Sequence, residues 1–289
     1  MIKFIFAGLA RLPLRVVHSA GALLGRLAYR APGRYRQRFE ANLSLSGLAR
    51  NPAQLAQLKR EAVMESGKAL AELPVIWSCA TPKLLAMVRI VDGWEDVTAA
   101  KAEGKGLIML TPHLGCFELI GRYLAAQFPI TILFRPPKLN WLEPLMRAGR
   151  DRDHAKLATT DVNGVRALLK ALKRGEALGI LPDQAPGAGD GVWADFFGRP
   201  AYTMTLIQRL QARSGAPIIA MYAQRLPRGQ GYDLHFKRLA EPLAADDAVA
   251  ARQLNQAMEN LIRLSPSQYL WSYNRYKIPS GATPPEGTP

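Results

Sequence analysis

The residues best suited to chemistry are a histidine and a glutamate five positions apart, His113 and Glu118, in the segment Thr-Pro-His-Leu-Gly-Cys-Phe-Glu. A carboxylate that hydrogen-bonds to one imidazole nitrogen fixes the tautomer of the ring and raises the basicity of the other nitrogen. Such a pair can take a proton from a hydroxyl as that hydroxyl attacks a thioester carbonyl. A histidine near a glutamate is also common by chance, so the pair alone leaves a purely structural role open.

The spacing restricts how these two side chains can meet. On one continuous helix a step of five residues turns by about 140°, so His113 and Glu118 would not face each other. They can meet only if His113 lies in a turn before a helix and Glu118 lies in the first turns of that helix. Pro112 and Gly115 flank the segment and permit such a turn.

Other kinds of catalytic site fit the sequence less well. No second histidine lies near His113 and no His-Glu-x-x-His spacing occurs, so we expect neither a metal site nor a cofactor. Cys116 could act as a nucleophile because it is close to His113, but a small apolar helix residue is the simpler interpretation. No Gly-x-Ser-x-Gly motif is present. Direct transfer without an acyl-enzyme is therefore the simpler mechanism.

The elements around His113 predict an α/β domain. The apolar run 106–110 indicates a buried strand with His113 just beyond its carboxyl end, and residues 115–127 indicate the following helix. Further strands are expected at 130–134, 156–159, 177–181, 217–225 and 232–239, the last two forming a hairpin. Helices are expected at 50–73, 162–173, 203–213 and 245–264, with 82–103 helical or mixed. This alternation predicts a largely parallel central sheet flanked by helices, with sites beyond the carboxyl ends of its strands.

Composition limits the class of protein. The chain has 289 residues, 48% of them hydrophobic, which suits one large domain and excludes global disorder. Two distant cysteines make no disulfide framework. A formal net charge of +15 points to an anionic partner, namely nucleic acid, an anionic membrane or an acidic protein, unless the chain is simply a basic soluble protein.

The N-terminal thirty residues have a helical pattern with two faces. Arginines fall on one face and interrupt the sequence, so it has no stretch of about 18 uncharged apolar residues. The pattern is typical of a helix that lies in a membrane interface. A cleaved signal peptide and a helix packed on the protein's own core are the alternatives. The apolar face consists of Ile5, Leu9, Leu12, Val16, Ala20, Leu23 and Leu27.

An ordered series of short motifs follows along the chain. Together with His113 and Glu118, which match a His-x4-Asp/Glu motif, it resembles the late (secondary) acyltransferases of lipid A biosynthesis, of the lauroyl and myristoyl type. The resemblance extends essentially up to Pro279. The motifs are Phe-Arg-Pro-Pro at 134–137, Arg-Ala-Gly-Arg-Asp-Arg at 147–152, Asp-Val-Asn-Gly-Val-Arg at 161–166, Leu-Pro-Asp-Gln at 181–184, Phe-Phe-Gly-Arg-Pro-Ala at 196–201 with Thr203, Pro-Ser-Gln-Tyr-Leu-Trp at 266–271 and Asn-Arg-Tyr-Lys at 274–277.

The resemblance implies a reaction and a location. A fatty acyl group would pass from acyl carrier protein to a hydroxyl of a lipid A precursor, forming an acyloxyacyl ester in lipopolysaccharide biosynthesis. His113 would be the general base and Glu118 its orienting partner. The enzyme would sit on the cytoplasmic face of the bacterial inner membrane and have a glycerolipid-acyltransferase-like fold. Residues 1–30 would then be the membrane-associating helix, 31–279 the acyltransferase domain and 280–289 a flexible tail.

The resemblance also implies substrate-binding residues, each with a plainer alternative. Arg135 would bind an anion or the oxyanion, although it could be a surface arginine. Arg150 and Arg152 would bind phosphate on the acceptor or on the carrier, unless they belong to a solvated charge run. The pair Asp183-Gln184 ends a buried strand and would occupy the pocket or position loops. Phe197 and Gly198 would line the acyl or acceptor site, although paired aromatic residues are more often core.

Some features depart from the family pattern, and two other functions stay open. Many relatives have a longer unbroken apolar N-terminus, so the arginines favour attachment to one side of the membrane. Cys116 and Phe117 stand where relatives often have a polar residue and a tryptophan. The acceptor could instead be a glycerophospholipid or another glycolipid. A protein of a different class, one that binds membranes or nucleic acid without catalysis, is disfavoured because no nucleic-acid-binding motif is visible.

Overall fold

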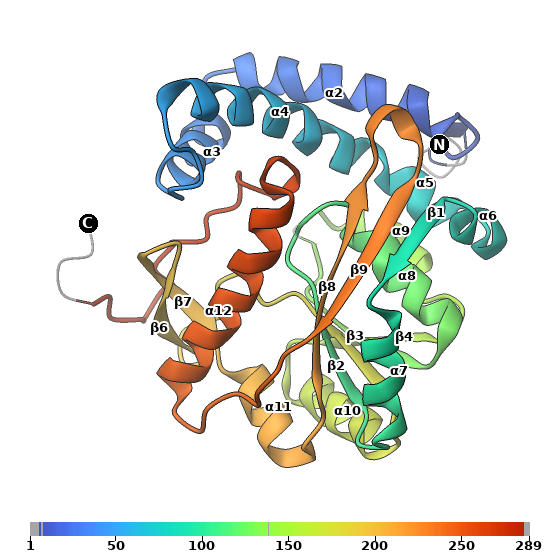
Figure 1. Ribbon diagram of the computed structural model, residues 1–289, viewed down its shortest axis with the longest axis vertical. Coiled ribbons are helices and arrows are strands. Elements are labelled where there is room, and N and C mark those ends of the chain that lie inside the picture. Colours follow the sequence, from blue (N-terminus) through green and yellow to red (C-terminus); the bar gives the residue numbers. More distant parts are fainter. Residues whose placement is uncertain (1–5, 7, 138, 286–289) are drawn as a thin grey trace.

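A central seven-stranded sheet organises the protein, as Figure 1 shows. The computed structural model describes residues 6, 8–137 and 139–285. The strand order is β1-β9-β8-β2-β5-β3-β4, and every neighbouring pair is parallel except β8 with β9. The prediction of an α/β fold with a largely parallel sheet is confirmed, and so is the hairpin. The strands are β1 (Val88–Asp92), β2 (Leu107–Leu110), β3 (Ile130–Phe134), β4 (Ala155–Thr159), β5 (Ala177–Ile180), β8 (Ile218–Arg225) and β9 (Tyr232–Arg238).

Helices cover both faces of this sheet because successive strand residues point to opposite faces. One core contains Leu107 and Met109 of β2, packed with the helices α6 (Thr81–Leu85), α7 (Trp94–Ala102) and α8 (Phe117–Gln127). The opposite core contains Ile108 and Leu110 of the same strand. On that side lie α3 (Arg34–Ser44), α10 (Val162–Lys173), α11 (Leu206–Ser214) and α12 (Asp247–Leu264).

Several elements were not expected from the sequence. The region 82–103 consists of α6, the edge strand β1 and α7. A separate antiparallel hairpin of β6 (Gly191–Phe196) and β7 (Arg199–Met204) packs on α12, so the helix expected from residue 203 begins only at Leu206. The short helices α5 (Leu73–Ser78) and α9 (Glu143–Arg150) were not predicted.

Two long helices lie across the end of the sheet at which β8 finishes (Figure 1). They are α2 (Leu14–Arg30) and α4 (Pro52–Ala71). Because β8 and β2 are parallel, this is also the end at which His113 follows β2. None of the helices in the described part of the chain combines the length and the apolar composition needed to cross a bilayer.

The expected flexible tail, 280–289, is described only in part. Residues 286–289, like Ile5 in the expected apolar face of the N-terminal helix, lie outside the described residues. The earlier part of the tail contacts the β6–β7 hairpin, because the indole of Trp193 donates a 2.7 Å hydrogen bond to the carbonyl of Thr283.

Candidate active site

His113 meets an aspartate at the carboxyl edge of the sheet. β2 and β5 are parallel neighbours in register, with Leu110 opposite Ile180, so the residues that follow the two strands lie side by side. Asp183 accepts a 2.8 Å hydrogen bond from Nδ1 of the His113 ring and a 2.9 Å bond from the main-chain N–H of His113. Two segments seventy residues apart in sequence thus form one site at the edge where α/β sheets commonly bind ligands.

Asp183 holds the ring in one tautomer. Its side chain is buried, which by itself would raise the pKa of the carboxyl group. The charge and the hydrogen bonds of His113, with the charge of Arg275, outweigh burial and lower the pKa of Asp183 below its ordinary value. An ionised carboxylate can only accept hydrogen bonds, so Nδ1 carries the proton and Nε2 of the neutral ring has a free lone pair. This is the form in which histidine acts as a general base.

The side chain of Gln184 forms a hydrogen bond with that nitrogen. Its amide nitrogen lies 3.1 Å from Nε2 of His113, where it can donate a hydrogen bond. The His113 side chain is 15% exposed, so a substrate can reach it. On another side the ring of Phe117 packs against the imidazole, with 4.8 Å between ring centres. A hydroxyl that gives its proton to Nε2 therefore has to replace the Gln184 amide.

Glu118 lies where the sequence placed it but has different partners. It occupies the first turn of α8, and His113 precedes that helix in a turn, as expected. Its carboxylate, however, accepts hydrogen bonds from the Trp77 indole at 3.0 Å and from Nε of Arg150 at 2.9 Å, and Nη2 of Arg150 forms a second, short bond. The expectation that Glu118 orients the His113 ring is therefore wrong for this structure. That hydrogen bond belongs to Asp183, because the neighbouring strand β5 brings it to Nδ1.

Glu118 nevertheless acts on the site as a buried charge. Burial favours its neutral form, but the charge of Arg150 outweighs burial and lowers the pKa of Glu118. A charged His113 lowers the pKa of Glu118 further, so the two groups are electrostatically coupled. Glu118 and Arg150 also line a small cavity between α8 and the sheet, whose other walls include Gly121, Ile132 and Gly179.

The loop that carries His113 is fixed by the chain after α12. The main-chain N–H of Leu270 donates to the His113 carbonyl at 3.0 Å, and that of Gly115 donates to the Gln268 carbonyl at 3.1 Å. Gly115 has a φ of 58°, and a Cβ there would lie 1.9 Å from the carbonyl oxygen of Ala223, so only glycine fits. The Gln268 side chain in turn pairs with both main-chain groups of Arg225, at 2.8 and 2.9 Å.

Arg225, at the end of β8, joins this loop to a buried polar network. Its Nη2 donates to the Gly115 carbonyl at 3.1 Å, and its guanidinium binds Glu72 through two hydrogen bonds of 2.5 and 2.9 Å. Glu72 also contacts His18 of α2 at 3.2 Å and accepts from the Tyr232 hydroxyl at 2.8 Å. Burial would raise the pKa of Glu72, but Arg225 and His18 lower it from 4.5 to about 2. Ionised Glu72 thus links α2 to the loop that carries His113.

The other residues implied by the family resemblance occupy varied surroundings. Arg135 is exposed after β3, and its charge acts on Tyr273, whose hydroxyl accepts a 3.1 Å bond from the N–H of Ala185. Arg135 therefore lies near the loop that carries Asp183. Arg152 donates to the carbonyls of Trp77 and Cys79, at 3.3 and 3.1 Å, so its observed contacts are within the protein.

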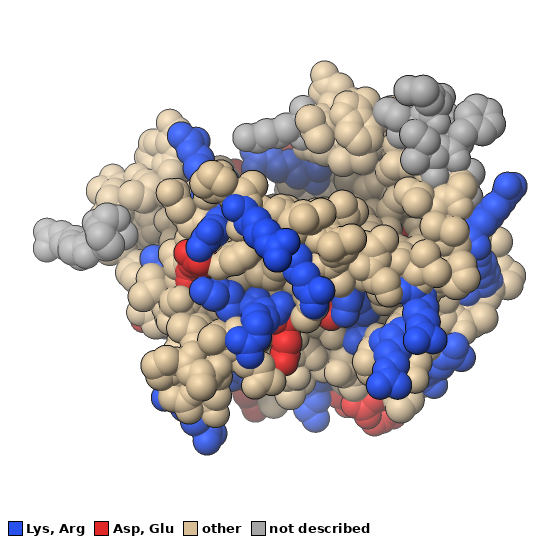
Figure 2. Space-filling model, turned by 90° about the horizontal axis from the view of Figure 1, so that it is seen from above, with Lys and Arg blue, Asp and Glu red and all other residues tan. Residues whose placement is uncertain are grey.

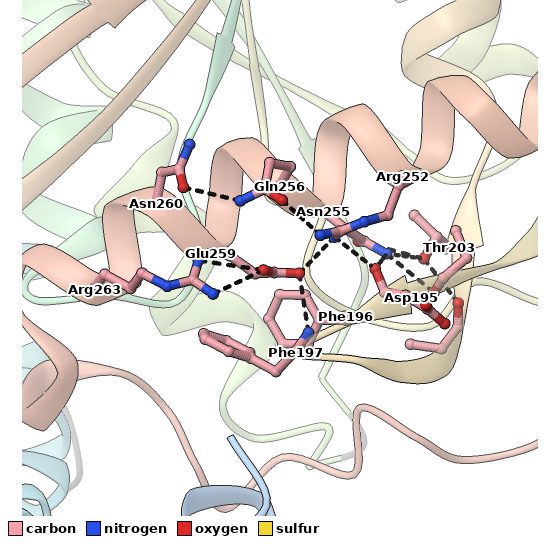
Figure 3. A network of polar contacts seen from close by, with 12 residues as sticks. Asp195, Phe196, Phe197, Thr203, Arg252, Asn255, Gln256, Glu259, Asn260 and Arg263 are labelled. Carbon is pink, nitrogen blue, oxygen red and sulfur yellow. Dashed lines mark hydrogen bonds and ion pairs between the residues drawn. The ribbon is translucent and has the colours of Figure 1, made fainter. Parts of the chain in front are cut away.

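Phe197 and Gly198 form the turn of the β6–β7 hairpin, as Figure 3 shows for the phenylalanine. The Phe197 N–H donates to Glu259 of α12 at 2.9 Å, and its buried ring lies near Trp271. Arg252 and Arg263 also bind Glu259, so one buried carboxylate fastens the turn to α12 (Figure 3). In this structure both turn residues have packing and turn-forming contacts.

The surroundings of Cys116 disfavour a role as nucleophile. Cys116 is fully buried, and burial raises its pKa well above the ordinary value, with Glu72 adding to the rise. A thiol that stays protonated is a poor nucleophile. Within the described residues, no group of three or more His, Cys, Asp or Glu side chains is placed to hold a metal ion.

Three positioning residues escaped the sequence reasoning, namely Gln268, Arg225 and Arg275. Arg275 is buried, binds Thr203 and the Tyr202 carbonyl, both at 2.7 Å, and contributes to the low pKa of Asp183. Gln268 and Arg275 stand in two of the motifs quoted above, which was the available signal. The partners named here lie 43 or more residues away along the chain, so only the fold reveals what these residues do.

Comparison with known proteins identifies the family. The family described as bacterial lipid A biosynthesis acyltransferase matches residues 1–278. The chain is 29% identical to the lipid A biosynthesis lauroyltransferase of Escherichia coli (strain K12), over 96% of this chain and 89% of the relative. It is 27% identical to the palmitoleoyltransferase of lipid A biosynthesis from the same organism, over 92% and 87% of the two chains. The chain therefore belongs to the bacterial lipid A biosynthesis acyltransferase family.

Proposed function

We propose that this protein transfers a fatty acyl group from acyl carrier protein to a hydroxyl of a lipid A precursor, with His113 as the general base. The observation that supports this most is the pair of hydrogen bonds that His113 donates to Asp183, through its main-chain N–H and Nδ1, because they leave Nε2 of a partly exposed ring as the basic nitrogen. Relatives named as lipid A lauroyl- and palmitoleoyltransferases supply the substrate class.

In the proposed reaction Nε2 of His113 takes the proton of the acceptor hydroxyl as its oxygen attacks the thioester carbonyl. A carbon–oxygen bond forms, the carbon–sulfur bond breaks, and the proton passes from the imidazolium to the leaving thiolate. The charge of Asp183 stabilises the imidazolium through Nδ1. Glu118 remains part of the catalytic machinery in this scheme as a second buried charge that favours the imidazolium, with Arg150 holding it in place.

The charge distribution fits the proposed substrates and location. Acyl carrier protein is acidic, lipid A precursors carry phosphates, and the cytoplasmic leaflet of a membrane is anionic, so each would be attracted to a chain of net charge +15. Arg135, exposed beside the Asp183 loop, is our candidate for binding an anionic group of donor or acceptor. We place the enzyme on the cytoplasmic face of the bacterial inner membrane, where the lipid acceptor would be.

An acyl-transfer assay tests the proposal. Purified protein in detergent is given acyl carrier protein loaded with several chain lengths and an under-acylated lipid A precursor, and the products are weighed by mass spectrometry. We expect a gain of one acyl group that is absent in a folded His113→Ala variant. Turnover by that variant would overturn the general-base assignment.

Failure with every chain length would overturn the acceptor assignment. The same assay with a glycerophospholipid acceptor, such as a lysophospholipid, would then show whether the chain acylates another lipid. The His113→Ala variant serves as the control for that reaction as well, and its fold is checked by circular dichroism and thermal unfolding.

A further inference from the structure

We infer that α2 is an in-plane membrane helix, which rests its leucine-rich face in the lipid interface and stays attached to α4 along its length. This deepens the proposed function, on which it rests, by stating which surface meets the bilayer and in which orientation.

The two faces of α2 have opposite surroundings. The face with Gly21, Gly25 and His18 is buried against the rest of the protein. The leucines point the other way, with Leu23 54%, Leu24 59% and Leu27 49% exposed. The alternative of a helix packed on the protein is thus met only in part, because α2 packs on α4 through its glycine face and leaves the leucine face exposed. Leu9, Leu12 and Val16 extend the exposed apolar stripe towards the N-terminus.

Backbone contact fixes α2 in this orientation. A Cβ on Gly67 of α4 would lie 2.0 Å from the Gly21 carbonyl oxygen and 2.6 Å from the Gly25 nitrogen, so the two helices touch without intervening side chains. Gly229, after β8, approaches Arg15 equally closely, since a Cβ there would lie 2.4 Å from the Arg15 nitrogen. Near the start of the helix His18 contacts the buried Glu72. Turning α2 to cross a bilayer would break all of these contacts.

Charge and position indicate lipid as the occupant of the stripe. At 100° per residue, Arg15 and Arg26 lie on the flank of α2 between the buried face and the apolar stripe, where lipid phosphates would meet them, and Arg11 lies in the turn before the helix. Figure 2 looks onto this end of the molecule and shows many more basic than acidic side chains on it. A second copy of the chain would bring like charges together, whereas an anionic leaflet neutralises them.

A second apolar segment supports the same surface. Leu139 and Trp141 are about half exposed, and the neighbouring Leu142 packs, like Phe6, against the cluster that contains Trp77. The segment therefore lies on the same side of the molecule as Phe6. Tryptophan is enriched where lipid headgroups meet the apolar core of a membrane.

Depth measurements on single labels test the orientation. Val16→Cys and Leu27→Cys variants are labelled with an environment-sensitive fluorophore, since the native cysteines are buried, and mixed with phosphatidylethanolamine–phosphatidylglycerol vesicles that contain brominated lipids. An in-plane helix gives equal, shallow depths at both positions. A spanning helix would separate them by about 16 Å, given a rise of 1.5 Å per residue. Val249→Cys, an equally exposed apolar site at the start of α12, is the control that should stay in water.

A triple variant tests the stripe itself. Leu23→Gln, Leu24→Gln and Leu27→Gln together should reduce vesicle binding by roughly tenfold or more, because three exposed apolar side chains are lost, while thermal unfolding stays unchanged. Unequal depths, labels that stay in water, or undiminished binding of the triple variant would each overturn the inference. These experiments contain no acyl substrate. If the labels report equal, shallow depths but the acyl-transfer assay shows no product, only the proposed reaction is overturned. If acyl transfer occurs but the two depths are unequal, only the orientation of α2 is overturned.

Discussion

Asp183 holds His113 at two points, the ring Nδ1 and the main-chain N–H, so one carboxylate sets both the tautomer of the base and the position of its backbone. Glu118, five residues after the histidine, instead accepts hydrogen bonds from Arg150 and Trp77. The two carboxylates near the base therefore have different tasks, which substitution can separate.

Asp183→Asn should reduce kcat by about 10²–10⁴-fold, the usual contribution of general-base catalysis, because a neutral amide no longer enforces the reactive tautomer. The variant should keep its fold. Glu118→Gln should reduce kcat less than this but lower the free energy of unfolding by about 3–5 kcal/mol, because it leaves the largely buried Arg150 without its charged partner. Steady-state kinetics and chemical denaturation of both variants check this. A stable Glu118→Gln variant with the larger loss of kcat would reverse the two assignments.

Gln184→Glu should move the acidic limb of the pH profile of kcat/KM to higher pH. A carboxylate beside Nε2 stabilises the protonated ring, so a higher pH is needed to restore the free base. The profile is measured from pH 5 to 9, with Gln57→Glu on the exposed side of α4 as the matched charge change. Superimposable profiles for the two variants would show that Gln184 does not contact the working base.

Acid should destabilise the protein through Glu72. Its pKa is lowered from 4.5 to about 2, so its ionised form stabilises the fold fully above pH 4.5 and progressively less as the pH falls towards 2. The shift corresponds to about 3 kcal/mol. Glu72→Gln should be less stable at pH 7 but lose less on acidification, as followed by denaturant unfolding at pH 7, 4.5 and 3. Glu61→Gln, on the helix α4 that Glu72 directly follows, is the control, and equal acid responses of the two variants would contradict the role of Glu72.

Gln268→Leu should reduce kcat by about 10–100-fold while KM changes little. The substitution removes the side chain that pairs with both main-chain groups of Arg225, and small displacements of a catalytic group are costly. Gln57→Leu provides the matched control on the surface. Kinetics of the two variants decide the matter, since a mainly structural role for Gln268 would lower the melting temperature and leave kcat of the folded fraction intact.

Gly67→Ala should lower the free energy of unfolding by about 1–3 kcal/mol, because its Cβ would collide with the backbone of α2. Gly8→Ala is the control, since nothing lies within 4 Å of a Cβ there. Thermal unfolding measures both. A Gly67→Ala variant as stable as the control would mean that α2 and α4 can move apart easily.

The local pattern predicted the parts of the site but not their pairing. The strand before His113 and the strand before Asp183 were both recognised from short apolar runs. That β2 and β5 are neighbours depends on sheet order, which no local pattern contains. The local pattern therefore assigned the hydrogen bond that orients the His113 ring to Glu118, the nearest acid in sequence. In the structure Asp183, which follows the adjacent strand β5, accepts that bond.

The same limit affected the hairpin and the N-terminus. Thr203 was expected in a helix because the helical pattern of α11 follows directly, whereas pairing with β6 places it in β7. In the N-terminal helix the apolar stripe was recognised, but periodicity cannot tell lipid from core. The small residues Gly21, Gly25 and Gly67 were the signal for the buried face, because glycines allow helix backbones to touch.

The hydrogen bond between the Gln184 amide and Nε2 of His113 has a consequence for hydrolysis of the acyl donor. Water is always at hand and could attack the thioester, discarding an activated fatty acid. A lone water molecule brings no other contacts with which to dislodge the amide, whereas a lipid acceptor anchored elsewhere on the enzyme does. We expect the resting enzyme to be guarded against futile hydrolysis until the acceptor itself uncovers the base.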